Sequence, residues 1–168
     1  MVNNVHQREF RATEAQLGEL LDRVAEPDGP LWPRRWPPMV LAGPLAVGVA
    51  GGHGPIRYRV AEYQPGRRVV FEFAAPTPLQ GTHSLEVQPG SGPATAVLRH
   101  VLAGRPVGLG LLSWPLVIRW LHDAVLEELL DRAGYAVGDP PTQPTRWSPW
   151  VRVCRRLLGA SESTPAAH

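Results

Sequence analysis

The chain has 168 residues, a length that suits a single domain, and its 43% of apolar residues argues against wholesale disorder. All 17 basic residues are arginines. The formal net charge of +2 is the sum of +3 in residues 140–168, where four arginines are accompanied by Glu162 alone, and −1 in residues 1–139. Residues 1–139 therefore lack the basic excess that nucleic-acid binding requires, and we expect no nucleic-acid partner.

The sequence also argues against several other kinds of site. Cys154 is the only cysteine, which excludes an internal disulfide and any metal site built from several cysteines. The N-terminus has no apolar signal-peptide segment, and the longest uncharged apolar run, residues 106–118, is too short to span a bilayer. We therefore expect a soluble cytoplasmic protein that has no transmembrane segment and needs no cofactor.

The first elements are a strand and an amphipathic helix. Residues 4–12 alternate loosely and predict a strand. Thr13, followed by Gln16 three residues later, has the spacing of a capping box at the start of a helix. The apolar stripe of this helix consists of Leu17, Leu20, Leu21 and Val24.

A proline-rich connection over residues 26–39 follows, because five prolines forbid a continuing helix. Trp32 and Trp36 are expected to pack this connection onto the core as a lid. The next segment, "GGHGPIRY", is not a phosphate cradle, because its glycines lead into a strand rather than a helix. We expect a loop whose glycines permit positive φ, with His53 at its rim.

Several strands that alternate in polarity are predicted next. Pro65 and Gly66 occupy the centre of a type II turn between the first two, and residues 88–95 join the last two as a hairpin. The faces expected to point inward carry Ile56, Tyr58 and Val60; Val69, Phe71 and Phe73; His83, Leu85 and Val87; and Ala96, Leu98, His100 and Leu102.

A long helix closes the predicted domain. Ser113 is a candidate cap, Pro115 suits the first turn, and Gly134 is the expected end. The central apolar stripe consists of Ile118, Leu121, Val125 and Leu129, and His122 lies about 40° from Ile118, inside this stripe. The acidic residues Glu127, Glu128 and Asp131 are expected to form a solvated face.

Residues 139–168 are predicted to be an appendage to a domain of residues 1–138. A proline-rich linker leads to a short basic amphipathic helix over residues 150–158, and residues 161–168 are expected to be frayed. The apolar side of this helix consists of Trp150, Val153, Cys154, Leu157 and Leu158. The helix could contact an anionic membrane surface or a protein partner, or fold back on its own domain.

The order of strand, helix, antiparallel strands and long helix indicates an α+β fold with the helices on one face of the sheet. With the segments "WPRRWPPM", "GGHGPIRY", "PGRRVVFEF", "GTHSLEV" and "WPLVIRWLHDAVLEELLDRA", this order resembles the SRPBCC superfamily of START-like, polyketide cyclase/dehydrase-like helix-grip proteins over about residues 3–135. The resemblance implies a curved antiparallel sheet wrapped around the long C-terminal helix, with an apolar cavity between them. It implies no particular reaction, because the superfamily shares no catalytic motif.

Three histidines are expected to converge in this cavity. If Val87 pairs with Ala96, His83 lies opposite His100, and His122 approaches from the helix. Convergent imidazoles can bind zinc or act as acid and base, and Tyr58 is a possible proton donor; we assign no metal site. The expected ligand-binding residues are Tyr58, Phe71, Phe73, His83, Leu85, Leu98, His100, Leu121, His122 and Val125.

Two functions are compatible with this cavity. The first is binding of a small hydrophobic molecule between the sheet and the helix. The alternative is a cyclase- or dehydratase-type enzyme acting on a polyketide-like or carbonyl substrate. In that case His83, His100 and His122 are the candidates for acid and base.

Overall fold

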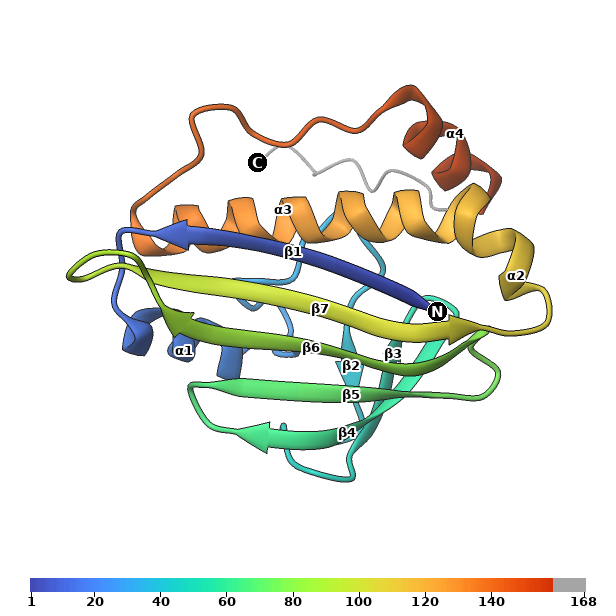
Figure 1. Ribbon diagram of the computed structural model, residues 1–168, viewed down its shortest axis with the longest axis horizontal. Helices are drawn as coiled ribbons and strands as arrows, with labels where there is room; N and C mark the ends of the chain where they lie inside the picture. Colours follow the sequence, from blue (N-terminus) through green and yellow to red (C-terminus); the bar gives the residue numbers. More distant parts are fainter. Residues whose placement is uncertain (159–168) are drawn as a thin grey trace.

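The computed structural model describes residues 1–158, which form a seven-stranded antiparallel sheet curved around one long helix (Figure 1). The strand order is β1-β7-β6-β5-β4-β3-β2. This α+β helix-grip arrangement confirms the predicted fold class. The strands are β1 (Val2–Phe10), β2 (Val40–Leu41), β3 (Ala50–His53), β4 (Ile56–Gln64), β5 (Arg68–Ala74), β6 (Leu79–Pro89) and β7 (Ala96–Pro106). The helices are α1 (Glu14–Asp22), α2 (Gly110–Ser113), a π-helical turn (Trp114–Ile118), α3 (Arg119–Val137) and α4 (Pro149–Leu157). The predicted fraying of residues 161–168 lies outside the described residues.

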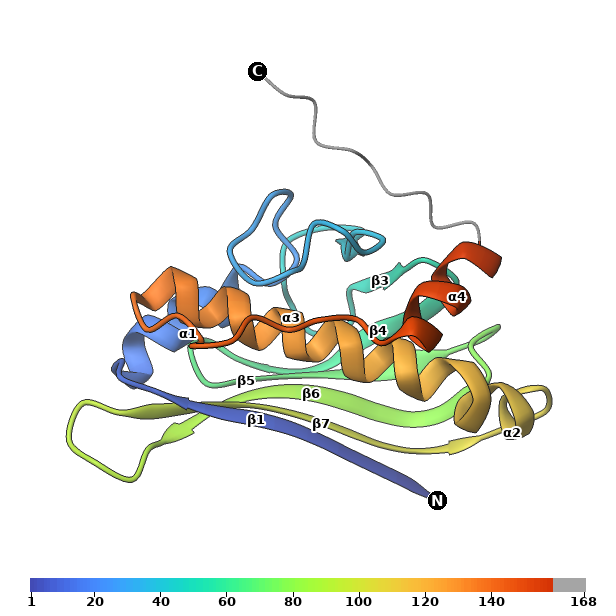
Figure 2. The same ribbon diagram turned by 90° about the horizontal axis from the view of Figure 1, so that it is seen from above.

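Seen from above, β1, β7, β6 and β5 lie along one side of α3, and β3, the connection over residues 23–49 and α4 lie on the other (Figure 2). The inward face of the sheet carries the apolar residues that strand alternation predicted. Tyr58 and Val60 of β4, Phe71 of β5 and Leu98 of β7 are almost fully buried. They pack with Leu129 and Leu130 of α3 into the main core.

Helix α1 is anchored to the turn between β4 and β5. Its capping box forms as predicted, with the Gln16 amide donating to the Thr13 hydroxyl. Gly66 takes the positive φ, 68°, that the predicted turn requires. The Gly66 amide donates to the Asp22 carboxylate over 2.8 Å, so the end of α1 holds this turn in place.

The long helix differs from its predicted limits at both ends. Helical structure begins at Gly110, Ser113 makes no capping hydrogen bond, and Pro115 lies within the π-helical turn. Because proline has no amide proton for the regular α-helical bond, a wider turn accommodates it. At the other end, α3 continues past Gly134 to Val137, and Gly138 adopts the left-handed cap with φ 77°.

Two of the three acidic residues of α3 that were expected on a solvated face are not solvated, and the third, Glu127, is half-exposed. Glu128 and Asp131 are both buried. Asp131 accepts hydrogen bonds from the Arg8 guanidinium of β1 and from the Thr145 amide of the tail. Glu128 accepts hydrogen bonds from Arg35 and from the Trp36 indole. The sequence pattern did not reveal this, because β1 and the tail cover Asp131, and Arg35 and Trp36 of the proline-rich connection cover Glu128, only in the folded protein.

The tail packs on α3. Trp147 and Val151 form a small core with Ala124, against which Trp36 and Leu121 pack. The amphipathic helix forms as predicted, but its predicted apolar side is wrong except at Cys154, which is buried. Trp150, Val153, Leu157 and Leu158 are exposed, and Val151 is buried instead. The division into a domain of residues 1–138 and an appendage stays a prediction.

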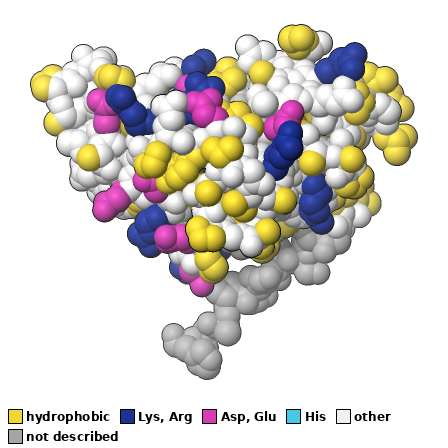
Figure 3. All heavy atoms as spheres, turned by 90° about the horizontal axis from the view of Figure 1, so that it is seen from below, with side chains coloured by type: hydrophobic (Ala, Val, Ile, Leu, Met, Phe, Trp, Pro, Cys, Tyr) yellow, Lys and Arg dark blue, Asp and Glu magenta, His cyan; other side chains and the backbone are white. Residues whose placement is uncertain are grey.

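On the face shown in Figure 3, arginines and acidic side chains are interspersed with apolar ones. Oppositely charged side chains on neighbouring strands also pair, as in the contact between Arg59 and Glu72, whose nitrogen and oxygen are 2.7 Å apart. Among the described residues, no helix combines the length and the apolar character needed to cross a membrane.

Candidate functional site

The candidate site begins with two histidines on neighbouring strands of the inward sheet face. The predicted register is wrong by two residues, because Leu85 rather than His83 pairs with His100, and His83 pairs with Leu102. The shift does not separate the two rings. They lie on a diagonal of the sheet, where long and aromatic side chains can still meet. His100 Nε2 is 3.4 Å from His83 Nδ1.

A third imidazole comes from α3 and a fourth from β1. The ring centroid of His122 lies 5.0 Å from that of His100. His6 pairs across the sheet with His100, and its centroid lies 6.1 Å from that of His122. The structure therefore joins the three histidines singled out from the sequence and adds His6. The alternation of Asn4, His6, Arg8 and Phe10 along the first strand was the signal that could have revealed it.

His6, His122, His100 and His83 form a row of histidines, and aromatic side chains extend this row beyond His83. The centroids of Phe71, Phe73 and Tyr58 lie 5.0, 5.1 and 5.2 Å from that of His83. The Tyr58 hydroxyl is 3.3 Å from His53 Nδ1, and Trp32 covers His53 at a centroid distance of 5.0 Å. His53 itself lies in a tight β3–β4 hairpin, in which Gly54 has a φ of 51°, rather than in an open loop.

Burial keeps the inner imidazoles uncharged. It lowers the pKa of both His83 and His100 well below the ordinary value of 6.5, and the surrounding histidines lower each pKa further. Burial also lowers the pKa of His53 to about 4. Burial raises the pKa of Tyr58 above its usual range, so the phenol keeps its proton. At neutral pH the inner row consists of neutral hydrogen-bonding groups.

The inner pair leaves hydrogen-bonding capacity unused. His83 Nε2 and His100 Nδ1 are buried and have no hydrogen-bond partner among the described residues. His122 Nδ1 makes no hydrogen bond among them either, but it lies 3.8 Å from the Asp123 carboxylate. A neutral imidazole carries one proton. If one ring of the His83–His100 pair donates to the other, the two outer nitrogens are left as one donor and one acceptor. This is true whichever ring donates.

The other end of the row is charged. His6 Nδ1 lies 2.7 Å from the Glu127 carboxylate, and His6 Nε2 lies 3.0 Å from that of Asp123. Hydrogen bonds to Asp123 and Glu127 raise the pKa of His6 to about 9, against an opposing effect of burial. His6 is therefore protonated at neutral pH, and it binds β1 to α3.

One group of described side chains has the composition of a metal site. Ligand atoms of His6, His122 and Asp123 all lie within 4.8 Å of one another. Here His6 Nε2 and Asp123 share a hydrogen bond, and Asn4 also donates to that carboxylate over 2.9 Å. A cation at this position would displace the proton of His6. His6 and Asp123 already have hydrogen-bond partners without one, and we propose no metal.

The remaining candidate residues lie in different parts of the interior. Leu85, Leu98 and Val125 are buried. Phe73 packs with Leu102 and Trp114 in a second small core beneath the start of the long helix. Leu121 instead joins the core formed with Trp147 of the tail, away from the row of histidines.

Comparison with solved structures shows that other proteins share this fold. No family model matches the chain, and no curated protein matches it. XoxI from Bacillus cereus has a TM-score of 0.60 and 18% identity, with 83% of this chain and 97% of that chain covered. CalU16 from Micromonospora echinospora has a TM-score of 0.56 and 14% identity, with 94% and 83% covered. CV1439 from Chromobacterium violaceum has a TM-score of 0.54 and 17% identity, with 83% and 98% covered. At these identities the similarity concerns the fold alone.

Proposed function

We propose that the protein binds a small, largely apolar molecule between the sheet and α3, and that His83 and His100 orient the polar group of that molecule. The supporting observation is the pair of buried outer nitrogens, His83 Nε2 and His100 Nδ1, which have no partner among the described residues. Buried polar groups without partners cost about 1–3 kcal/mol, so such groups are uncommon unless they have a role.

The surroundings of the pair favour an apolar ligand with a planar or carbonyl-bearing group. Phe71 and Phe73 stack on His83 with interplanar angles of 22° and 25°. Such aromatic walls supply contact area, whereas one donor and one acceptor supply orientation. The neutrality of the rings matches a ligand that carries no charge at the buried end.

The binding test uses the protein purified from its own host. Native mass spectrometry should detect a noncovalent adduct that denaturation releases. His100→Leu should weaken retention of the identified ligand about tenfold, because a ligand polar group then loses its partner. Arg59→Gln, on the exposed outer face of the sheet, should leave retention unchanged.

The same variant has a stability readout that strengthens the test. Replacing the buried His100 by leucine removes one nitrogen that lacks a partner, Nδ1, but also removes the contact of Nε2 with His83 Nδ1. The two effects oppose each other, so His100→Leu should unfold at a urea concentration close to that of the wild type. A variant that is stable yet fails to bind would support the proposal. Unchanged ligand retention in His100→Leu would contradict it.

A second function, acid–base catalysis on a carbonyl substrate, is favoured by the 3.4 Å contact between the two neutral rings. A proton accepted at one outer nitrogen can be matched by a proton released at the other, with transfer across the shared contact. The pair could thus act as acid and base in one step, with the Tyr58 hydroxyl as a further donor. In that case, His83→Leu should abolish conversion of the identified ligand, measured by product formation under single-turnover conditions.

Two further expectations remain part of the proposal. A cytoplasmic location is one. Contact of the tail with an anionic membrane surface or a protein is the other, and the exposed Trp150, Val153 and Leu157 on the outer side of α4 support it.

A further inference from the structure

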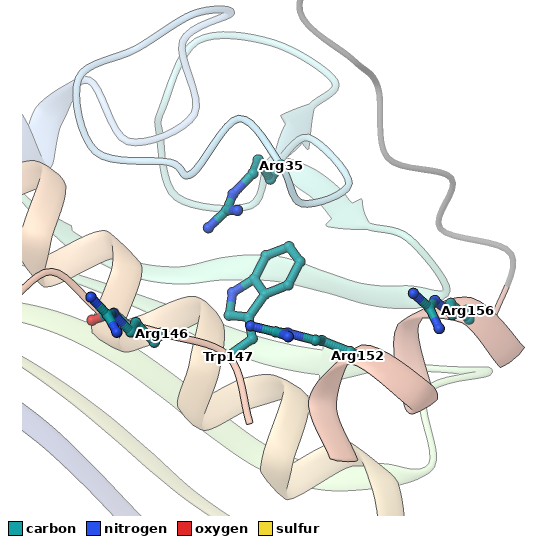
Figure 4. Close-up of a pocket in the computed structure, with 6 residues that line it drawn as sticks. Arg35, Arg146, Trp147, Arg152 and Arg156 are labelled. Carbon is teal, nitrogen blue, oxygen red and sulfur yellow. The ribbon is translucent and has the colours of Figure 1, made fainter. Parts of the chain in front are cut away.

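A second candidate site lies outside the row of histidines, where the tail meets the connection over residues 33–38. A pocket of about 310 Å³ opens there, at the small end of the range for ligand pockets. Its lining consists of Arg35, Thr145, Arg146, Trp147, Arg152 and Arg156. Figure 4 shows Arg35 extending from the connection toward the Trp147 indole, and Arg152 extending from α4 toward the same ring. Four of the six lining residues are cations and none is acidic.

Three of the four arginines that line this pocket differ from the other arginines of the described residues, because neither a carboxylate nor another oxygen among those residues pairs with their guanidinium groups. Elsewhere in the described chain, arginine guanidiniums form ion pairs with carboxylates or donate to oxygens of carbonyl and amide groups, as Arg105 does to Gln80 and Arg132 to Gly29. Within residues 1–158, Arg146, Arg152 and Arg156 form no ion pair and no side-chain hydrogen bond. All three line this one pocket. Their charges are therefore available to a ligand.

The pocket is built on a fixed wall. The Arg35 guanidinium lies 4.1 Å from the Trp147 ring centroid, and the Arg155 guanidinium lies 4.0 Å from it. Arg155 also donates to the Arg35 carbonyl over 2.6 Å, and Glu128 holds the Arg35 side chain with an oxygen 2.6 Å away. The Thr145 amide is held by Asp131. These contacts join the connection, the tail and α3 before any ligand arrives, so little ordering is needed on binding.

We propose that this pocket binds a phosphate group. Guanidinium groups donate in pairs to phosphate oxygens, and clusters of arginines are the usual recognition element for this group. Arg152 and Arg156 are one helical turn apart on α4, so their guanidinium groups extend from the same face of the helix. Three guanidiniums without partners match the multiple charge of a phosphate monoester or pyrophosphate better than a single carboxylate.

The phosphate could belong to a free soluble molecule or to a lipid headgroup. The exposed Leu157 and Val153 of α4 lie on the helix that carries Arg152 and Arg156, which allows a headgroup to bind at a membrane surface. The recognition chemistry is the same for both sources. The proposal does not depend on a ligand beneath α3.

The first experiment measures binding of inorganic pyrophosphate to the full chain by isothermal titration calorimetry at low salt. Arg152→Gln combined with Arg156→Gln should weaken binding at least tenfold, roughly the effect of losing charge-assisted hydrogen bonds. The matched control combines Arg59→Gln with Arg67→Gln, which removes the same charge from exposed side chains elsewhere, and binding should stay within about twofold. Circular dichroism verifies that all three proteins are folded.

The second experiment uses sedimentation with vesicles of phosphatidylcholine, with and without phosphatidic acid. If the wild type and the control bind pyrophosphate and the Arg152/Arg156 variant does not, the result supports a soluble phosphate ligand. If pyrophosphate does not bind but phosphatidic acid vesicles sediment the wild type and the control, and not the variant, the source is a lipid headgroup. The proposal is overturned if the wild type binds neither probe. It is equally overturned if both double variants lose binding alike, or if the Arg152/Arg156 variant binds as the wild type does.

Discussion

His6 shows how one side chain acquires a property that its neighbours in the sequence do not suggest. The residues next to it, Val5 and Gln7, carry no charge. Folding brings it between Asp123 and Glu127, more than a hundred positions away in the chain. Charged partners then favour the protonated imidazole, whereas the apolar surroundings of His83 and His100 favour the neutral one. The same residue type therefore has opposite charge states at the two ends of one row.

These opposite shifts predict a stability maximum near neutral pH. The folded-state pKa of His6, about 9, exceeds the unfolded value of 6.5, so its contribution is complete below pH 6.5 and is lost as pH rises through 9. His83 and His100 have a lowered pKa in the folded state, so unfolding takes up protons and stability falls below pH 6.5. Urea unfolding midpoints measured from pH 5 to pH 10 should be highest between about pH 6.5 and 7.5.

His6→Gln isolates the alkaline side of this profile. The wild type should lose about 2 kcal/mol between pH 7 and 9.5, less than the full shift implies, because solvent screens the 40% exposed Glu127 side chain. The variant should start from a lower stability at pH 7 and should not show this alkaline decline. An equal decline in both proteins would show that His6 is not the group responsible.

Gly18 of α1 shows that helix propensity alone does not predict how a substitution changes the stability of the protein. Gly18 lies in the middle of this helix, where alanine is favoured by about 1 kcal/mol. A Cβ atom at Gly18 would meet the Gly66 carbonyl oxygen and Cα, which are backbone atoms that cannot rotate away. The glycine allows α1 to approach the β4–β5 turn that Asp22 holds.

Gly18→Ala is therefore expected to lower the free energy of unfolding by roughly 1–3 kcal/mol, the usual cost of overpacking, despite the gain in helix propensity. Glu19→Ala is the matched control, because it introduces the same residue at the adjacent, exposed position of the same helix. Thermal unfolding followed by circular dichroism compares the two. A Gly18→Ala protein more stable than the wild type would mean that the helix and turn can move apart.

At the level of the whole molecule, residues 139–158 of the tail pack against the rest of the folded structure. Trp147 and Val151 cover Ala124 of α3, and Arg155 lies between Trp147 and Trp36, with its guanidinium 4.7 Å from the Trp36 ring centroid. The tail and residues 33–36 contact each other, and together they cover α3. They also create the arginine pocket, which neither segment forms by itself.

Two valines of α4 test this role. Val151 is 4% exposed and Val153 is 41% exposed, and both lie on the same helix. Val151→Asp should lower the urea midpoint strongly, by about 3 kcal/mol or more in unfolding free energy, because it buries a charge in an apolar contact. Val153→Asp should change it by less than about 0.5 kcal/mol. Equal effects of the two substitutions would contradict the packing of the tail on α3.

Local patterns in the sequence determined much of this protein. Alternation assigned Tyr58, Phe71, His83 and His100 to the inward face of the sheet, because side chains on a strand alternate by steric necessity. The capping box at Thr13 and the turn at Gly66 depend only on nearby residues, so they too were predictable. The role of these residues in binding remains a prediction.

Only the tertiary structure decided which distant residues meet. The register of β6 and β7 depends on how the whole sheet packs, and the alternation of Leu85, Leu98 and their neighbours is equally satisfied after a shift by two. The burial of Glu128 and Asp131 and the isolation of Arg146, Arg152 and Arg156 arise from contacts among the tail, α3 and residues 33–36. Charge and burial are properties of a three-dimensional neighbourhood, so no local pattern in the chain records them.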